Sequence, residues 1–246
     1  MVIPLIVRGI TYTDHLTRPE PFVDPNTIKE NVSQCSADAP FNEMPVEQAP
    51  LDENHNFTER DVTRASDDEA SRTEITPIGA LVTATGVLTV LDFGSDNDDA
   101  LPLARTVEPG FYPVDRVTAF GRNAAVRVRF SDEVPASWHP ASPPDTGHVI
   151  SVDAGCVCVV DYAGYAGMTQ RAKERVYDRF TTFEGPAAAA EFKVGRTNMG
   201  IACESGYGDG GYPAYWGVDA QGRIAQLVID FLVLASQDDD GILTHL

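Results

Sequence analysis

Apolar and polar residues alternate in short runs over most of the chain after residue 75. Residues 126–130 (Val-Arg-Val-Arg-Phe) alternate apolar and basic side chains, so we expect a strand with one buried and one wetted face. Residues 80–91 are rich in β-branched side chains, with Gly86 marking a turn or bulge. Residues 227–234 are apolar almost throughout, which is typical of a strand covered on both faces. The pattern predicts a β-rich globular domain over residues 76–246.

One segment has the periodicity of a helix instead. Residues 169–183 place Val176, Phe180 and further apolar side chains at helical spacing, and a Gly-Pro pair follows them. Residues 218–223 have the composition of a tight turn that leads into the last apolar run. We therefore predict an α+β, β-rich fold: antiparallel sheets in a sandwich-like arrangement, with one main helix packed alongside.

The first part of the chain has a different composition. Between residues 33 and 74, eleven acids stand against three arginines, with prolines at positions 40, 45 and 50 and little periodicity. Such a composition is typical of a solvated or irregular segment. We expect residues 1–75 to form an N-terminal acidic, partly irregular extension, and the sequence leaves open whether this extension folds onto the domain.

The net charge narrows the choice of partners. The 18 basic and 37 acidic residues give a charge of −19, which repels nucleic acid and anionic membranes and favours cations or a basic protein partner. A solvated acidic surface, as in a protein from a high-GC or salt-adapted source, is the simpler interpretation of this charge. No run approaches the roughly 20 apolar residues that span a bilayer, and the start lacks the basic region of a signal peptide. We therefore expect a soluble, cytoplasmic protein whose four cysteines are reduced.

The most distinctive stretch is the glycine–aromatic segment, residues 205–217 (SGYGDGGYPAYWG). It combines five glycines, four aromatics and one acid, which predicts a shaped loop rather than a flexible linker. Its aromatic rings would stack a sugar or a planar ligand. The alternative is that Tyr212 and Trp216 fill the core. The candidate ligand-binding residues are Ser205, Tyr207, Tyr212, Tyr215 and Trp216.

Acidic residues stand at expected strand ends and within this segment. Asp153, Asp161, Glu204 and Asp209 could converge on a rigid scaffold, where carboxylates bind Mg²⁺ or Ca²⁺ or act as a general acid–base pair. We assign Asp209 and Asp153 as candidate catalytic residues, and Asp153, Asp209 and Glu204 as candidate metal ligands. A divalent cation is the only cofactor that this set suggests. The alternative for Asp209 is that it caps its own turn.

Two further groups allow more than one interpretation. Asp230 lies in an apolar run, so its carboxyl needs a partner or stays protonated, and we expect a structural ion pair with an arginine such as Arg127 or Arg129. Cys156 and Cys158 share a face of a strand and, with Cys203 and His148, would supply four zinc ligands. The spacing is weak for zinc, and buried cysteines that behave as small apolar side chains are commoner.

Several of these motifs occur in one order. They are Val90-Leu91-Asp92, residues 105–114, residues 126–133, residues 152–155, the glycine–aromatic segment with Trp216-Gly217-Val218-Asp219, and residues 227–231. In this order the chain resembles a bacterial family known only as domain of unknown function 4241, over roughly residues 79–234. Tyr207 stands where the family pattern usually has tryptophan. The resemblance implies a domain boundary but no activity.

Two functional hypotheses follow from the sequence. The first is a small-molecule or cation site on the glycine–aromatic segment, with hydrolysis as its chemistry, although residues 203–207 lack the G-x-S-x-G elbow of serine hydrolases. The second is a non-catalytic, immunity-type interaction protein whose acidic surface neutralises a basic partner. The density of the glycine–aromatic segment favours the first.

Overall fold

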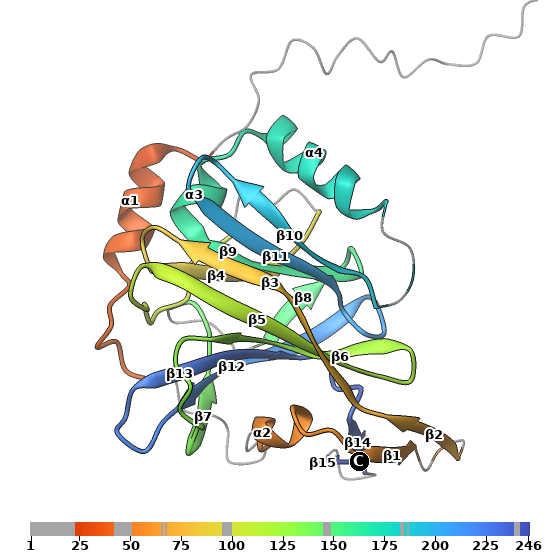
Figure 1. The fold of residues 1–246 in the computed structure, drawn as a ribbon. Helices are drawn as coiled ribbons and strands as arrows, with labels where there is room; N and C mark the ends of the chain where they lie inside the picture. The colour runs from red at the N-terminus through yellow and green to blue at the C-terminus, as the bar shows by residue number, and fades with distance from the viewer. Residues whose placement is uncertain are drawn as a thin grey trace, which may run out of the picture.

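The structure is a computed structural model that describes residues 23–41, 51–64, 66, 68–94, 100–144, 149–182, 185, 187–238 and 242–246 (Figure 1). Its helices are α1 (Pro25–Ser33), α2 (Glu53–Asn56), α3 (Tyr162–Ala166) and α4 (Gln170–Phe180). Its strands are β1 (Asp61–Arg64), β2 (Glu69–Arg72), β3 (Glu74–Thr83), β4 (Leu88–Asp92), β5 (Gly110–Ala119), β6 (Arg122–Arg129), β7 (Ser137–Pro140), β8 (Val149–Val152), β9 (Cys156–Asp161), β10 (Ala189–Val194), β11 (Asn198–Glu204), β12 (Gly210–Val218), β13 (Ile224–Asp230), β14 (Ala235–Gln237) and β15 (Leu243–His245).

One antiparallel sheet organises the fold. Its strand order is β4-β9-β11-β3-β5-β6-β13-β12-β7, with β10 also paired to β11 and β8 also paired to β12. The sheet curls, so that β8 approaches β4 from the far end of the path. Short hairpins, β1–β2 and β14–β15, lie beside it. The prediction of a β-rich α+β fold with antiparallel strands and few helices is confirmed.

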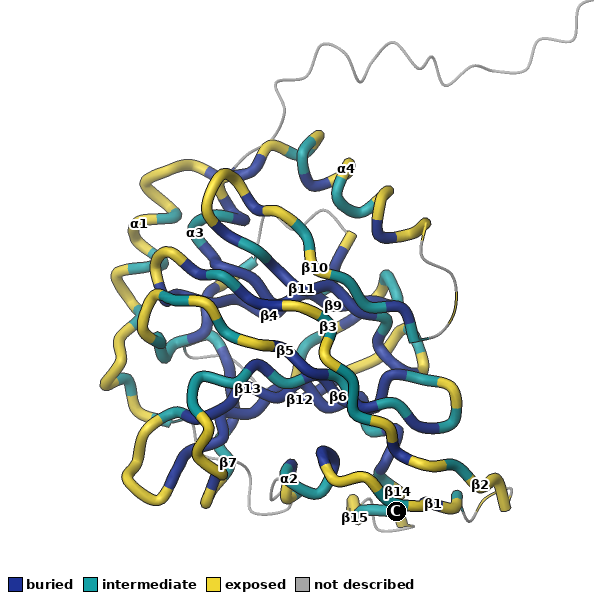
Figure 2. Tube along the Cα trace, viewed as in Figure 1, coloured by how far each residue is buried: buried dark blue, intermediate teal, exposed yellow. Residues whose placement is uncertain are grey.

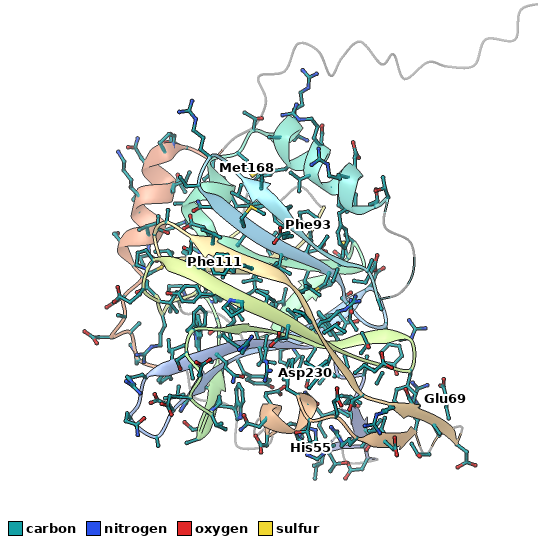
Figure 3. All side chains as sticks on the ribbon, in the orientation of Figure 1. His55, Glu69, Phe93, Phe111, Met168 and Asp230 are labelled. Atoms are coloured by element: carbon teal, nitrogen blue, oxygen red, sulfur yellow. The ribbon has the colours of Figure 1, made fainter. Side chains whose placement is uncertain are left out.

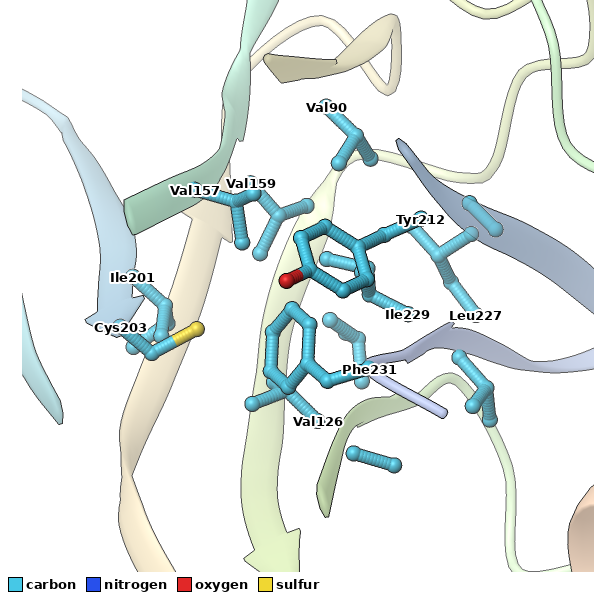
Figure 4. Close-up of a cluster of buried hydrophobic side chains, with 14 of the residues drawn as sticks. Val90, Val126, Val157, Val159, Ile201, Cys203, Tyr212, Leu227, Ile229 and Phe231 are labelled. Carbon is cyan, nitrogen blue, oxygen red and sulfur yellow. The ribbon is translucent and has the colours of Figure 1, made fainter. Parts of the chain in front are cut away.

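The main core fills the inside of the curled sheet (Figure 4). Side chains alternate along β9, so Val157 and Val159 point into this core, where they meet Tyr212 of β12 and Phe231. The alternation predicted for residues 126–130 is also present, because Val126 and Val128 are buried while the arginines between them are only half-buried.

A second core lies on the outer face of β9. Cys156 and Cys158 pack there with Phe180 of α4, the helix that the sequence predicted over residues 169–183. The Thr169 hydroxyl begins α4 by accepting a hydrogen bond from the amide of Ala172 at 3.3 Å. Figure 2 shows the buried central strands beneath the exposed outer faces of α1 and α4. None of the helices in the described ranges is long and apolar enough to cross a membrane.

The described parts of the acidic N-terminal region fold onto the domain. The side-chain amide of Asn31 in α1 donates to the Tyr162 hydroxyl of α3 at 2.7 Å, and Val23 packs into a small cluster with Tyr162. Phe57, directly after α2, and Val62 of β1 belong to the main core. This region therefore supplies core side chains as well as charged surface.

Candidate functional site

The glycine–aromatic segment is a short turn followed by a strand. Residues 205–209 form the turn, and residues from 210 onward belong to β12. The segment expected to be a loop is therefore a loop in its first part and a strand in its second. Ser205 is fully buried, and its hydroxyl donates to the Gly208 carbonyl at 2.7 Å. The Tyr212 hydroxyl donates to the same carbonyl at 2.8 Å. These contacts hold the turn in one shape and occupy the Ser205 hydroxyl, which is therefore poorly placed to act as a nucleophile.

Three of the four predicted stacking rings are buried. Tyr212 packs edge-on against Phe231 at a centroid distance of 5.4 Å, and Trp216 is 1% exposed. Both fill the main core, as the alternative interpretation had it. Tyr215 is buried on the opposite face of β12, where burial raises the pKa of its hydroxyl and the nearby carboxyls of Glu53 and Asp230 raise it further. None of these three rings offers an open face to a ligand in this conformation.

Tyr207 is the exposed aromatic of the turn, with 51% of its surface accessible. The guanidinium of Arg122 lies 5.1 Å from the ring centroid and that of Arg64 lies 5.9 Å from it. Arg122 also donates to the Gly206 carbonyl at 2.9 Å, a hydrogen bond that helps to hold the turn in place. Tyr207 is the one predicted stacking residue of this turn whose ring faces solvent.

Two of the predicted acids face one small space beside Gly155. A Cβ built on Gly155 would lie 3.9 Å from Glu204 Oε2, 3.9 Å from Asp209 Oδ1 and 3.7 Å from Gly208 Cα. Gly155 has a φ of +66°, a conformation that glycine adopts without strain. Both carboxylates thus lie near the face of Gly155 where a side chain would stand, an arrangement that we call the carboxylate site (Glu204 and Asp209, beside Gly155).

Asp153 lies on the same turn between β8 and β9 but points into solvent. Asp92, at the end of β4, accepts hydrogen bonds from the amides of Asp153 and Ala154, both at 3.1 Å. Asp92 therefore shapes the turn that presents Gly155. The three predicted acids thus lie at one end of the sheet. Glu204 and Asp209 both lie near Gly155, whereas Asp153 points into solvent.

The carboxylate site is electrostatically negative. Glu204 is half-buried, and burial raises its pKa. Burial raises the pKa of the neighbouring Cys156 thiol to about 12, with Glu204 and Asp92 as further causes. Across the described ranges, no lysine or arginine forms an ion pair with Asp153, Glu204 or Asp209. Such a site attracts cations.

The described residues contain no group of three or more histidine, cysteine or acidic side chains arranged to hold a metal ion. The predicted ligands Asp153, Asp209 and Glu204 are therefore not assembled as a three-ligand cage. A metal ion at the carboxylate site would be held by two carboxylates and would complete its shell with water or with groups of a substrate.

Asp161, the fourth candidate acid, has a structural role. It is fully buried, and its carboxylate accepts hydrogen bonds from Thr83 Oγ1 at 2.6 Å and Thr85 Oγ1 at 2.8 Å. The amide of Gly164 donates to its other oxygen at 2.9 Å, so Asp161 caps α3. Every contact of this carboxylate serves the fold rather than a ligand.

The four-ligand zinc arrangement does not form. Cys156 and Cys158 share the outer face of β9, as predicted, but Cys203 points into the main core on the opposite face of the sheet. The pairing of Val157 with Cys203 across β9 and β11 sets these opposite directions. His148 lies outside the described residues. All four cysteines are free.

The predicted partner of Asp230 was wrong. Arg127 and Arg129 both form ion pairs with Asp115, at 3.1 Å and 2.9 Å. Asp230, labelled in Figure 3, accepts from the Leu232 amide at 2.8 Å, and the buried carboxyl of Glu53 in α2 lies beside it. The sequence did not predict Glu53 as the neighbour of Asp230, because Glu53 lies in an acidic segment expected to be solvated. Its position directly after the helix-capping Asp52 was the available signal.

No curated protein and no solved structure matches this chain significantly. A family model with the description "Protein of unknown function (DUF4241)" matches residues 81–229, which is more than half of the 246 residues. The matched range contains Gly155, Glu204 and Asp209 and agrees with the resemblance found in the sequence. The chain therefore belongs to the DUF4241 family, a family of proteins of unknown function.

Proposed function

We propose that this protein binds a small cationic ligand or a divalent metal ion at the carboxylate site. The observation that supports the proposal is the convergence of Glu204 and Asp209 on the space beside Gly155, with no cationic side chain of the described residues paired to either. Burial has partly removed water from Glu204, so a cation bound there would replace the lost solvation of its carboxylate.

The glycines of the site give it access and rigidity. Gly155 and Gly208 place no side chain between the carboxylates, so a ligand can approach the backbone closely. The turn beneath is held by Ser205, Tyr212 and Arg122, so little ordering would be needed on binding. The glycines of the segment would therefore contribute to a binding site, even though most aromatic rings of the segment are buried.

Hydrolysis is the finer part of the proposal. In a reaction without a metal ion on Glu204, its raised pKa would suit a general acid, while Asp209 is exposed and can act as a base; with a cation bound, both side chains act as carboxylates. Asp153 would contribute at the edge of the site. Ser205 has no part in this chemistry, because its hydroxyl is buried and engaged.

A basic protein partner has weaker support. In the described part of residues 33–74, Asp61 and Glu59 pair with Arg72, Glu69 pairs with Arg64, and Glu53 is buried. Several acids of this region thus serve the domain itself. We also propose a cytoplasmic location, which suits four free cysteines, three of them buried.

Thermal shift and isothermal titration calorimetry on the whole protein would test the binding proposal. The probes are MgCl₂, CaCl₂, MnCl₂, spermidine and L-argininamide, each against the wild type, Glu204→Gln, Asp209→Asn and the control Glu133→Gln. Glu133 is an exposed acid outside the site. A probe at 100 times its dissociation constant adds about 2.7 kcal/mol to the free energy of unfolding.

We expect at least one probe to stabilise the wild type and the control, and to lose this effect in both site variants. Loss in the control as well would indicate general charge screening and contradict the proposal. Binding retained by both site variants would place the cation elsewhere. If no probe binds but a basic protein is captured with an affinity that falls steeply with salt, the interaction hypothesis replaces this one.

A further inference from the structure

A concave region, which we call the Arg105 cleft, lies between segments that are distant in sequence. Residues 37–38 after α1, residues 105–108 between β4 and β5, and residues 222–224 of the β12–β13 turn surround it. Its volume is about 450 Å³, within the range of small-molecule sites. None of the carboxylate-site residues lines this cleft, so it would be a separate site.

Arg105 is the residue that gives the cleft its chemistry. Its Nη2 donates to the Ala37 carbonyl at 2.6 Å, and its guanidinium lies 3.8 Å from the centroid of the Phe41 ring. Its Nε is buried and has no hydrogen-bond partner. In a chain with 37 acids and 18 basic residues, no carboxylate of the described ranges forms an ion pair with Arg105.

The backbone holds this arginine in place. The amide of Ser36 donates to the Ala104 carbonyl at 3.0 Å, and the amide of Thr106 donates to the Ser36 carbonyl at 3.3 Å. Ser36 and Arg105 thereby form a parallel bridge between the N-terminal region and the β4–β5 connection. Burial lowers the pKa of Arg105, so its charge is incompletely solvated, and the charge of Asp38 in the lining only partly offsets this effect. A fixed, partly desolvated and unpaired guanidinium favours an anion.

The other lining residues restrict the size and charge of that anion. Tyr112 and Phe130 pack edge-on at a centroid distance of 4.8 Å, and the Tyr112 hydroxyl is already engaged with the Glu108 carbonyl, so they offer an apolar surface. Arg223, on the β12–β13 turn, is held by an ion pair with Asp219 at 2.9 Å. Asp38 and Glu108 are exposed in the lining and would repel a ligand of higher negative charge.

We propose that the Arg105 cleft binds a small organic carboxylate, whose carboxylate pairs with the guanidinium of Arg105 and whose apolar part rests on Tyr112 and Phe130. A monoanion suits the lining better than a phosphate, because Arg223 is already paired with Asp219 and the exposed Asp38 and Glu108 oppose a higher negative charge, which leaves Arg105 as the lining arginine without an ion pair. Planar guanidinium and carboxylate groups match in geometry, which favours this class over other monoanions.

Isothermal titration calorimetry with four probes separates these features. Sodium phenylacetate has the ring and the carboxylate, sodium acetate lacks the ring, benzylamine replaces the carboxylate by an ammonium group, and phenyl phosphate adds negative charge. We expect phenylacetate to bind most tightly, acetate and phenyl phosphate more weakly, and benzylamine not at all. Equal binding of benzylamine and phenylacetate, or tighter binding of phenyl phosphate, would overturn the proposed class.

The Arg105→Gln variant tests the residue, and Arg171→Gln, an exposed arginine of α4, is the control with the same change of charge. Because a hydrogen bond to a charged group contributes about 1.5–3 kcal/mol, we expect phenylacetate affinity to fall by about tenfold or more in Arg105→Gln. The control should stay within about twofold of the wild type. Unchanged binding by Arg105→Gln would refute the assignment.

Nuclear magnetic resonance on the wild type gives a second measurement that does not depend on the variant folding. Phenylacetate should shift the Nε–Hε signal of Arg105 and the amide signals of Thr106 and Ile224, both in the lining. Shifts centred on other residues, or no shift at concentrations on the order of 10 mM, would overturn the proposal. The carboxylate site should be unaffected by this probe, so failure here leaves the proposed function standing.

Discussion

The buried carboxyls of Glu53 in α2 and Asp230 in β13 lie beside each other in the protein interior, and each influences the pKa of the other. Both residues are at most 2% exposed, and neither has a cationic partner among the described ion pairs. The Oε1 atom of Glu53 is buried and lacks a conventional donor, which a proton shared with Asp230 would satisfy. Asn56 donates to Glu53 Oε2 at 2.8 Å. Two adjacent buried carboxyls are stable only when at least one keeps its proton.

This pair should make the folded protein less stable as the pH rises. Burial, and then the charge of Asp230, raise the pKa of Glu53 well above its usual value, and burial raises that of Asp230 to about 6. The unfolded groups titrate near pH 4, so above that pH the native state binds more protons than the unfolded state. The contribution of the pair is fully present below about pH 4 and is lost as the pH rises through about 6.

We expect Glu53→Gln to reduce this loss, because a neutral amide replaces one acid and can donate to Asp230. Urea unfolding of the wild type and the variant between pH 4 and pH 8 gives the difference curve, in which other carboxylates cancel. The wild type should lose more stability than the variant as the pH rises, because the variant no longer carries the raised pKa of Glu53. Parallel curves, or the same flattening in the exposed control Glu133→Gln, would show that the pair does not titrate in this way.

A second prediction separates structural from candidate functional acids. Asp161→Asn should lower the free energy of unfolding by about 2–4 kcal/mol, because the buried carboxylate accepts hydrogen bonds from Thr83, Thr85 and Gly164. Asp153→Asn removes an exposed side chain and should stay within about 0.5 kcal/mol of the wild type. Denaturant midpoints measure both. Equal losses in the two variants would show that the structural division between these acids is wrong.

A third prediction concerns Ser205. Ser205→Ala removes one of the two hydrogen bonds to the Gly208 carbonyl. Because the Tyr212 hydroxyl still donates to that carbonyl, the free energy of unfolding should fall by only about 1 kcal/mol. Any hydrolytic activity found for the protein should survive this change and should be lost in Glu204→Gln. Loss of turnover in Ser205→Ala, with melting temperature nearly unchanged, would falsify the structural role assigned to this hydroxyl.

Local patterns in the sequence predicted local structure well. The alternation in residues 126–130, the helix at α4 and the turn between β12 and β13 follow from side-chain periodicity and turn composition, which depend on neighbours in the chain. Gly86 likewise lies in the predicted turn, with a φ of +74° and the Val107 carbonyl against the place where a Cβ would stand. Such features need no knowledge of distant segments.

Partners across the fold could not be predicted in the same way. Cys156 and Cys158 share a face because they are two residues apart, whereas the face of Cys203 depends on the register between β9 and β11. The neighbour of Asp230 comes from α2, a four-residue helix inside a segment whose composition resembles irregular chain. The nearness of Glu204 and Asp209 could be predicted because both acids end or follow one strand, β11.

The last prediction concerns thiol reactivity. The Cys35 thiol is half-buried and donates to the Asn31 carbonyl at 3.3 Å, and burial raises its pKa to about 11. Burial also raises the pKa values of Cys156, Cys158 and Cys203. Because the thiolate is the reactive form and a free cysteine has a pKa near 8.5, all four should react at least about a hundredfold more slowly at pH 8 than in the unfolded protein.

Titration with a chromogenic disulfide reagent, in buffer and in guanidinium chloride, measures these rates. We expect four fast thiols in denaturant and, in the native protein, one slow phase that disappears in Cys35→Ser, since the other three cysteines are at most 2% exposed. The remaining thiols should then react only at the rate of unfolding. Fewer than four reactive thiols in denaturant would reveal a disulfide. Rapid reaction of the native Cys35→Ser variant would show that the sheet opens at β9 or β11 far more readily than its packing between two cores implies.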